Sequence, residues 1–104
     1  MKTEQVASLL GELEQTMKVK GLWSGMPPSP EAMSSQLPFC VDTMTFSEWL
    51  QWIYINRMRA MIEHGAELPK GGSLFPYAEE AFKAMGTDAT VLLEIISRLD
   101  KVLA

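Results

Sequence analysis

Cysteine is scarce in this chain of 104 residues, where Cys40 is the only one. A disulfide needs two thiols, so the chain cannot form one within itself, and the disulfide framework of a small secreted domain is excluded. Thiols without partners are typical of reducing compartments. The sequence therefore predicts a cytoplasmic protein whose fold depends on an apolar core.

Long apolar runs are also missing. The first residues pass directly into an amphipathic pattern and lack the continuous apolar segment of a secretion signal. No stretch approaches the roughly 20 apolar residues that a helix needs to cross a bilayer. We therefore expect no membrane association.

Positive charge is sparse and scattered. Nine Lys and Arg residues face thirteen Asp and Glu residues, which gives a net charge of −4. Nucleic-acid-binding proteins usually gather basic residues on one face, so we expect no direct binding of nucleic acid. One histidine, His64, and one cysteine do not make a metal-ligand pattern. No glycine-rich phosphate loop is visible, and we expect no cofactor, no metal ion and no catalytic residue.

Strand signals are absent as well, because no segment alternates apolar and polar residues between turn dipeptides. The apolar fraction of 47% and the charged fraction of 21% are those of a globular protein. A chain of this length is the usual size of one domain. We predict a single all-α domain over residues 1–104.

The first predicted helix runs from Thr3 to Lys20, before Gly21. Its apolar residues share one helical face and are Val6, Leu9, Leu10, Leu13 and Met17. A long connection over residues 21–41 follows. In it, Ser29 followed by Pro30 predicts one short helical turn over residues 30–35. The side chains expected to pack this connection are those of Trp23, Met33 and Phe39.

The second predicted helix opens with the clearest local signal. Thr45 and Glu48 have the spacing of a capping box, and Gly65 is placed to end the helix after His64. Apolar residues between positions 46 and 62 cover more than one stripe. A helix of this kind belongs at the centre of a fold, so we expect the other three helices to enclose it.

Two further helices complete the predicted fold. The third runs from near Ser73 to Met85, and the fourth starts at Thr87 or Asp88 and reaches the C-terminal residues. Together these segments predict a small four-helix bundle. Its long first connection contains a short extra helical turn.

Several strings around the second helix carry a family resemblance. They are PFCVDTM over residues 38–44, EWLQW over 48–52, INRM over 55–58, LP at 68–69 and PYAE over 76–79. Over nearly its whole length the chain resembles the YqcC-like family of small bacterial proteins. The resemblance implies a compact helical fold. Some members are labelled tRNA pseudouridine synthase because their genes tend to lie beside one for that enzyme, which implies such an enzyme as a partner.

One position departs from the family pattern. The family often has proline where this chain has Asn56. Proline kinks a helix, so we expect the second helix to be straighter here than in such relatives.

The family label raises the hypothesis of an RNA-modifying enzyme. Pseudouridine synthesis needs a catalytic aspartate in a basic cleft that admits a flipped base. Asp42 is the one candidate, and its alternative role is that of a turn residue before the second helix. The acidic charge and the lack of a basic cluster favour the second role.

Arg57 falls between Ile53 and Met61 on a regular helical wheel, inside the apolar arc. A buried guanidinium needs a carboxylate partner, and Asp42, Glu79 and Glu80 are the candidates. The pair could tie a loop to the second helix. Alternatively, Arg57 could line a pocket and receive an anionic group.

We predict a protein-interaction module that uses residues 26–44 and the adjoining face of the second helix. Exposed tryptophans and adaptable methionines are typical of binding surfaces. The residues expected on this surface are Phe39, Asp42, Met44, Trp49, Trp52, Arg57 and Met58. The alternative is a carrier of a small apolar or amphiphilic ligand, anchored by Arg57. The sequence does not fix the identity of the partner or the oligomeric state.

Overall fold

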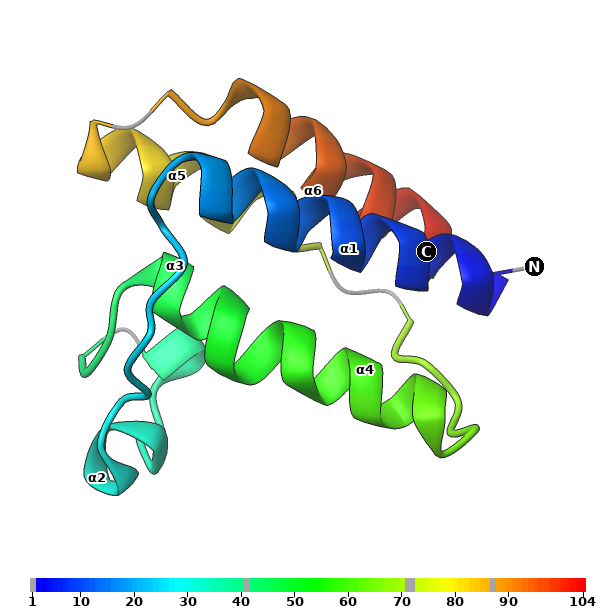
Figure 1. Ribbon diagram of the computed structural model, residues 1–104, viewed down its shortest axis with the longest axis horizontal. Helices are drawn as coiled ribbons and strands as arrows, with labels where there is room; N and C mark the ends of the chain where they lie inside the picture. The colour runs from blue at the N-terminus through cyan, green and yellow to red at the C-terminus, as the bar shows by residue number, and fades with distance from the viewer. Residues whose placement is uncertain (1, 41, 71–72, 87) are drawn as a thin grey trace.

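A computed structural model describes residues 2–40, 42–70, 73–86 and 88–104. The described elements, in chain order, are α1 (Lys2–Val19), α2 (Pro30–Met33), η1 (Pro38–Cys40), α3 (Phe46–Trp49), η2 (Leu50–Ile55), α4 (Asn56–Glu63), α5 (Phe75–Met85) and α6 (Thr90–Leu103). These residues contain no strand. The predicted all-α fold is therefore confirmed, with four long helical segments and the short extra turn (Figure 1).

Helix α1 buries the face that its apolar spacing predicts. Val6, Leu9, Leu10, Leu13 and Met17 are all buried. At its end, Gly21 adopts a left-handed conformation with φ of 72°, and the backbone N–H of Leu22 donates to the carbonyl of Met17 at 2.8 Å. This is the hydrogen bond of a Schellman cap, and it turns the chain into the long connection.

The second predicted helix is continuous from Phe46 to Glu63, and Gly65 follows it with φ of 69°. The capping box is present: Thr45 Oγ1 accepts from the N–H of Glu48, and Glu48 Oε1 accepts from the N–H of Thr45. The helix is not regular, however, because its middle part, η2, is a π-helix. Such wide turns are rare in proteins as a whole. Those that do occur are often found at functional sites.

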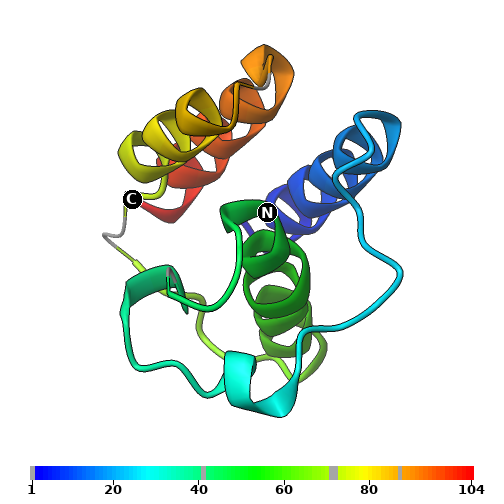
Figure 2. The ribbon, with the colours of Figure 1, turned by 90° about the vertical axis from the view of Figure 1, so that its left-hand side faces the viewer.

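The helices form two layers. Helices α1 and α6 lie side by side and run antiparallel, with α5 beside α6 (Figure 1). The long helix α3–η2–α4 packs across α1 and α5, as the end-on view in Figure 2 shows. The core lies between the layers and contains the fully buried side chains Leu10, Leu13, Leu50, Ile55, Phe82, Leu92, Ile96 and Leu99.

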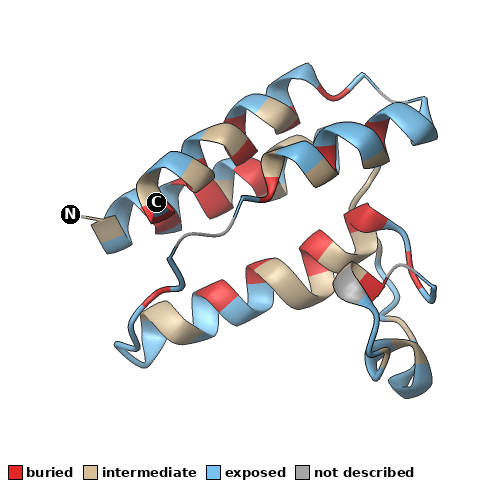
Figure 3. Ribbon diagram, turned by 180° about the vertical axis from the view of Figure 1, so that it is seen from behind, coloured by how far each residue is buried: buried red, intermediate tan, exposed pale blue. Residues whose placement is uncertain are grey.

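The long helix is not enclosed on all sides, which corrects the prediction of a central helix. Ile55 and Met58 are buried, but Trp52, Ile53 and Tyr54 are only half-buried. Figure 3 shows buried positions along one side of this helix and exposed positions on the other. Two layers of helices leave one flank of the long helix to the connecting segments and the solvent.

The connection from α1 to α3 follows that flank. Ser29 caps α2 by accepting from the N–H of Ala32 at 3.1 Å, so the predicted short turn is confirmed. Trp23 packs against the core, whereas Met33 is 40% exposed, contrary to its expected packing role. The amide of Gln51 in η2 binds the backbone of Ser24 and ties the connection to the long helix.

An exposed ion-pair network joins the two layers. Glu14 of α1 contacts Lys18 at 2.7 Å and Arg59 of α4 at 2.6 Å. These hydrogen bonds hold the pKa of Glu14 below its usual value because they favour the charged carboxylate.

The two last helices start later than the sequence suggests. Helix α5 begins at Phe75, and Gly86 ends it in a left-handed conformation, as predicted. Helix α6 begins at Thr90; of the two predicted starts, Asp88 lies before the helix and Thr87 lies outside the described residues. None of the described helices combines the length and apolarity that crossing a bilayer requires.

Candidate functional site

A surface hollow of about 790 Å³ lies between α5 and the segment that leads into α3. We call this hollow the aromatic groove. It is lined by Phe39, Thr43, Met44, Thr45, Phe46, Glu48, Tyr77, Glu80, Ala81, Ala84 and Met85. Its lining residues belong to η1, to the residues before and within the capping box, and to one face of α5. Segments that are far apart in the sequence therefore build the groove.

Phe39 is the centre of the aromatic groove. Its ring stacks on Tyr77 with centroids 4.0 Å apart and an angle of 15° between the planes. It also meets the edge of Trp49 at 4.9 Å and contacts Phe46 at 6.0 Å. Aromatic pairs at such distances stabilise a fold beyond the area they bury. The cluster therefore fixes η1 against α3 and α5.

The backbone under this ring is strained. Phe39 and Cys40 have φ angles of 57° and 50°, in the left-handed region. For residues other than glycine this conformation costs on the order of 1–2 kcal/mol each. The carbonyl of Cys40 accepts from the N–H groups of Thr43 and Met44, both at 3.0 Å. These bonds and the ring stacking hold a conformation that presents Phe39 to α5, and strain of this kind is concentrated at functional sites.

The charged residues that line the aromatic groove are all acidic. Glu48 and Glu80 are its two charged lining residues. The carboxylate of Glu48 is fixed by its bonds to the N–H and hydroxyl of Thr45 at 2.9 and 3.1 Å. Glu80 is exposed and has no ion-pair partner among residues 2–40, 42–70, 73–86 and 88–104. An apolar floor with a carboxylate rim suits a segment that is apolar on one side and basic at its edge.

A smaller cavity of about 200 Å³ lies on the other side of Phe39. It is lined by Phe39, Tyr54, Pro69, Ser73, Leu74, Asp100 and Leu103. Burial raises the pKa of Tyr54 to about 12, and the charge of Asp100 adds to this shift. The oxygens of Asp100 accept from the backbone N–H groups of Leu74 and Phe75 at 3.0 and 2.8 Å. The cavity is therefore mostly apolar, with its carboxylate already engaged.

The structure brings together three of the seven residues predicted for the binding surface. Phe39 and Met44 line the aromatic groove, and Trp49 contacts the rings of Phe39 and Phe46. Met58 does not belong to the surface, since it is 2% exposed and lies in the core. Trp52 lies on η2, half-buried, away from the groove lining.

Trp52 has one unusual feature. Its indole Nε1 is buried and has no hydrogen-bond acceptor among the residues that the structure describes. A buried indole N–H usually has a partner. Trp52 therefore holds an unpaired donor within the described part of the chain.

The two charged residues of the predicted surface have other roles. Asp42 is exposed and accepts from the hydroxyl of Ser35 at 2.5 Å, which fits its predicted role as a turn residue. Arg57 is exposed, so its predicted place inside the apolar arc is wrong. It forms no ion pair with Asp42, Glu79 or Glu80, and it lines neither the aromatic groove nor the smaller cavity.

Sequence reasoning missed the α5 side of the groove. Tyr77, Glu80, Ala81, Ala84 and Met85 form this wall. Tyr77 and Ala81 are half-buried on α5, whereas Met85 is 41% exposed. The available sequence signal was a methionine, Met85, in the same predicted helix as Tyr77, because methionine is common at adaptable binding surfaces.

Within the described part of the chain, no group of three His, Cys, Asp or Glu residues could hold a metal ion. Cys40 is buried and free. The aromatic groove provides a hollow shape, aromatic ring faces and carboxylates. Proteins use such features to recognise another molecule.

Comparisons with known proteins place these features in context. A family model, DUF446, described as tRNA pseudouridine synthase C, matches residues 5–102. An uncharacterised protein from Haemophilus influenzae is 41% identical over 93 residues, which are 89% of this chain and 88% of that protein. A protein from Pectobacterium carotovorum named tRNA pseudouridine synthase C is 38% identical over 66 residues, which are 64% of this chain but only 18% of that protein.

The fold also has a solved counterpart. The protein YqcC from Escherichia coli is 31% identical over 101 residues, covering 97% of this chain and 93% of that protein. Its solution NMR structure aligns with a TM-score of 0.87 over 99% of this chain and 88% of that structure, at 30% sequence identity.

Proposed function

This chain belongs to the DUF446 family, described as tRNA pseudouridine synthase C, and we propose that it acts as a protein-interaction module. The aromatic groove is its binding surface, and a tRNA pseudouridine synthase is its partner. In this proposal the chain binds the enzyme and does not itself perform the chemistry.

The aromatic groove carries the proposal. Its ring cluster is held in place by a strained backbone at Phe39 and by the capping box at Thr45, so the surface exists before a partner arrives. A preorganised surface loses less conformational entropy on binding. Aromatic and methionine side chains are enriched in the cores of protein interfaces. Tyr77 and Met85 provide both at one edge of the groove.

The relative from Pectobacterium carotovorum supports the choice of partner. Its match to this chain makes up only 18% of a protein named tRNA pseudouridine synthase C. Most of that protein therefore lies outside the match. A segment similar to this chain is joined to a larger remainder in that protein, which supports a contact between such a segment and an enzyme of that name.

A carrier of a small apolar ligand is the second candidate. The cavity between Phe39 and Tyr54 supports it, being mostly apolar and partly enclosed. Its volume of about 200 Å³ is small, since ligand sites usually measure roughly 300–1,000 Å³. Arg57 does not line it, so the predicted head-group anchor is missing. This reading is therefore the weaker one.

Binding of a purified tRNA pseudouridine synthase tests the first proposal, measured by isothermal titration calorimetry. Ala84 is an exposed residue of the groove wall, and Ala60 is an exposed residue of α4 outside the groove. The Ala84→Arg variant places a long side chain over the groove, and we expect affinity to fall by at least about tenfold. The matched control Ala60→Arg should bind like the wild type.

Two results would overturn this proposal. One is an absence of binding between the wild-type chain and the enzyme. The other is equal affinity of the two arginine variants, which would place the contact elsewhere. A separate assay incubates the isolated chain with unmodified tRNA, and formation of pseudouridine there would establish the enzyme reading instead.

A further inference from the structure

The cavity between Phe39 and Tyr54 shares a wall with the aromatic groove. Phe39 lines both hollows, so its ring separates one from the other. Leu74, at the start of α5, and Leu103, in the last turn of α6, also line the cavity and are both buried. We call this hollow the inner cavity. It lies behind the proposed binding surface and is lined from both layers of helices.

The size of the inner cavity suits a molecule with a single ring. Its volume is about 200 Å³, and an apolar protein cavity of about 150 Å³ is enough to bind benzene. Sites for larger ligands usually measure roughly 300–1,000 Å³, so a long amphiphile would not fit. The cavity is partly open, and a small molecule can therefore enter it without unfolding the chain.

The polar groups of the inner cavity favour a neutral ligand. The carboxylate of Asp100 lines it and is already held by the N–H groups of Leu74 and Phe75. Burying a charge in an apolar cavity is costly, and this carboxylate would also repel an anion. The hydroxyl of Tyr54 has no hydrogen-bond partner among the residues that the structure describes. It stays protonated at neutral pH, so it can donate to an oxygen of a ligand.

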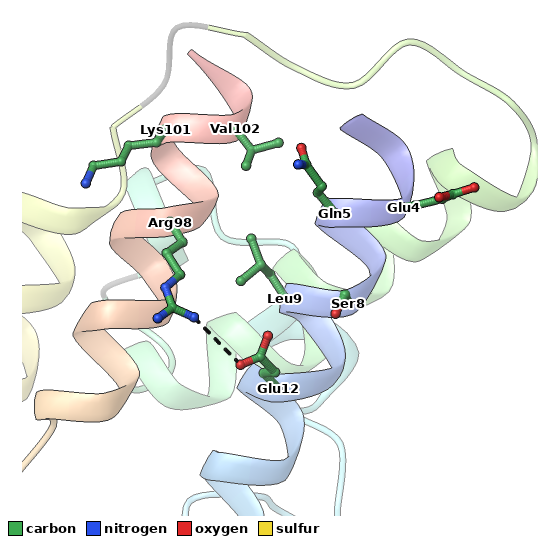
Figure 4. Close-up of a pocket in the computed structure, with 8 residues that line it drawn as sticks. All are labelled: Glu4, Gln5, Ser8, Leu9, Glu12, Arg98, Lys101 and Val102. Carbon is green, nitrogen blue, oxygen red and sulfur yellow. Dashed lines mark ion pairs between the residues drawn. The ribbon is translucent and has the colours of Figure 1, made fainter. Parts of the chain in front are cut away.

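A larger hollow on the other side of α6 is lined mostly by polar side chains (Figure 4). We call it the α1–α6 hollow, and its volume is about 540 Å³. Its Arg98 already pairs with Glu94 at 2.6 Å. Val102 lines the α1–α6 hollow, whereas Leu103, the next residue, lines the inner cavity. These two adjacent positions provide a matched pair for testing a ligand site.

We propose that the inner cavity binds a neutral aromatic molecule with a single ring, and that this ligand holds Phe39 against Tyr77. The backbone of Phe39 is strained, with φ of 57°, so its position depends on what supports its ring. Tyr77 supports the ring from α5 at 4.0 Å, and a ligand would support it from the inner cavity. The ligand would thus stabilise the aromatic groove. Only an effect on synthase binding rests on the proposed function.

An NMR titration of the isolated full chain with phenol tests this site, because phenol is neutral and has one ring and one hydroxyl. A Kd on the order of 1 mM is within the range for so small a ligand. We expect the methyl signals of Leu74 and Leu103 to shift to a plateau. Those of Leu9 and Val102, in the α1–α6 hollow, should stay in place. Ring signals of Tyr77 should also shift, although Tyr77 does not line the inner cavity.

Two variants and two other molecules make the test specific. Leu103→Phe fills the inner cavity and should weaken phenol binding by at least about tenfold, whereas Val102→Phe should bind phenol like the wild type. Tyr54→Phe should weaken phenol binding by about threefold to tenfold and leave toluene binding unchanged. Benzoate, an anion, should bind the wild type at least about tenfold more weakly than phenol.

The wild-type titration decides the proposal even if Leu103→Phe fails to fold. Phenol shifts that reach no plateau, or that are equally large at Leu9 and Val102, would overturn the site. So would a folded Leu103→Phe variant that binds phenol as tightly as the wild type. Unmoved signals of Tyr77 would overturn the support of Phe39, and equal affinity for benzoate would overturn the preference for a neutral ligand. No synthase is present, so the partner test can fail independently.

Discussion

Gln51 and the backbone of Ser24 form a reciprocal pair of hydrogen bonds across 27 residues of sequence. The N–H of Ser24 donates to Oε1 of Gln51 at 2.7 Å, and Nε2 of Gln51 donates to the carbonyl of Ser24 at 2.6 Å. Gln51 is 3% exposed. Buried amides persist where their hydrogen bonds are satisfied. This pair fixes the long connection that leads to Phe39, so it supports the aromatic groove from a distance.

Replacing Gln51 by leucine should destabilise the fold by about 1–3 kcal/mol, because the partly buried N–H and carbonyl of Ser24 lose their partners. Urea unfolding followed by tryptophan fluorescence measures the change. Gln15→Leu, at an exposed position of α1, is the matched control and should have little effect. Equal stability of the two variants would show that the pair contributes nothing.

Asn56 should tolerate proline better than other positions in the long helix. Its side chain donates to the carbonyl of Trp52 at 3.0 Å, and its backbone N–H bonds to Ile53. The N–H of residue 56 therefore makes no regular hydrogen bond to the carbonyl of Trp52, and proline there removes only the N–H bond to Ile53 and the side-chain bond. We expect Asn56→Pro to cost about 1–2 kcal/mol, against about 3 kcal/mol or more for Ala60→Pro in α4.

Urea unfolding of both proline variants checks this expectation, with circular dichroism to confirm their helical content. If Asn56→Pro were as damaging as Ala60→Pro, the wide turn before residue 56 would not provide the expected tolerance.

Asp100 positions α5 from the neighbouring helix. Its carboxylate accepts the N–H groups of Leu74 and Phe75, which begin α5 and lack acceptors within that helix. Asp100→Ala should cost about 1–2 kcal/mol, and Asp100→Asn should cost less because it keeps one acceptor oxygen. The free energies of unfolding of the wild type, Asp100→Ala and Asp100→Asn test this order of stability. An alanine variant as stable as the wild type would contradict this capping role.

The stability of the chain should fall in strong alkali through Tyr54. Burial raises the pKa of Tyr54 from 10.0 to about 12. The unfolded chain loses this proton near pH 10 while the folded chain keeps it, so rising pH favours unfolding. The contribution of Tyr54 is complete below pH 10 and is lost between pH 10 and about 12.

Tyr54→Phe has no hydroxyl to ionise and should lose this part of the pH dependence. Urea unfolding at several pH values inside that window measures both slopes. Identical slopes for the wild type and the phenylalanine variant would mean that Tyr54 ionises freely in the folded chain.

Much of the fold follows from local rules of sequence. The buried face of α1, the Schellman cap at Gly21 and the capping box at Thr45 all depend on residues a few positions apart. Such patterns can be read without knowing what packs on them. The aromatic groove needs more, because Phe39 and Tyr77 meet only when η1 and α5 are placed side by side.

The error at Arg57 has a specific physical cause. A regular period carries the apolar face from Phe46 and Leu50 through Ile53 to Arg57. The π-helix η2 adds one residue to a turn, so the buried face continues through Ile55 and Met58 instead. A helical wheel assumes a constant period and cannot detect this shift. Arg57 consequently faces the solvent.

The same shift makes the length of this segment more important than its composition. Each residue of a helix turns the chain by about 100°. If this segment adopted a regular period at its present length, α4 would rotate relative to α3, and Arg57 would turn toward the interior in place of Met58. Removing one residue from η2 at the same time would cancel that rotation and leave Met58 on the buried face. The wide turn and its extra residue can therefore be lost in evolution only together.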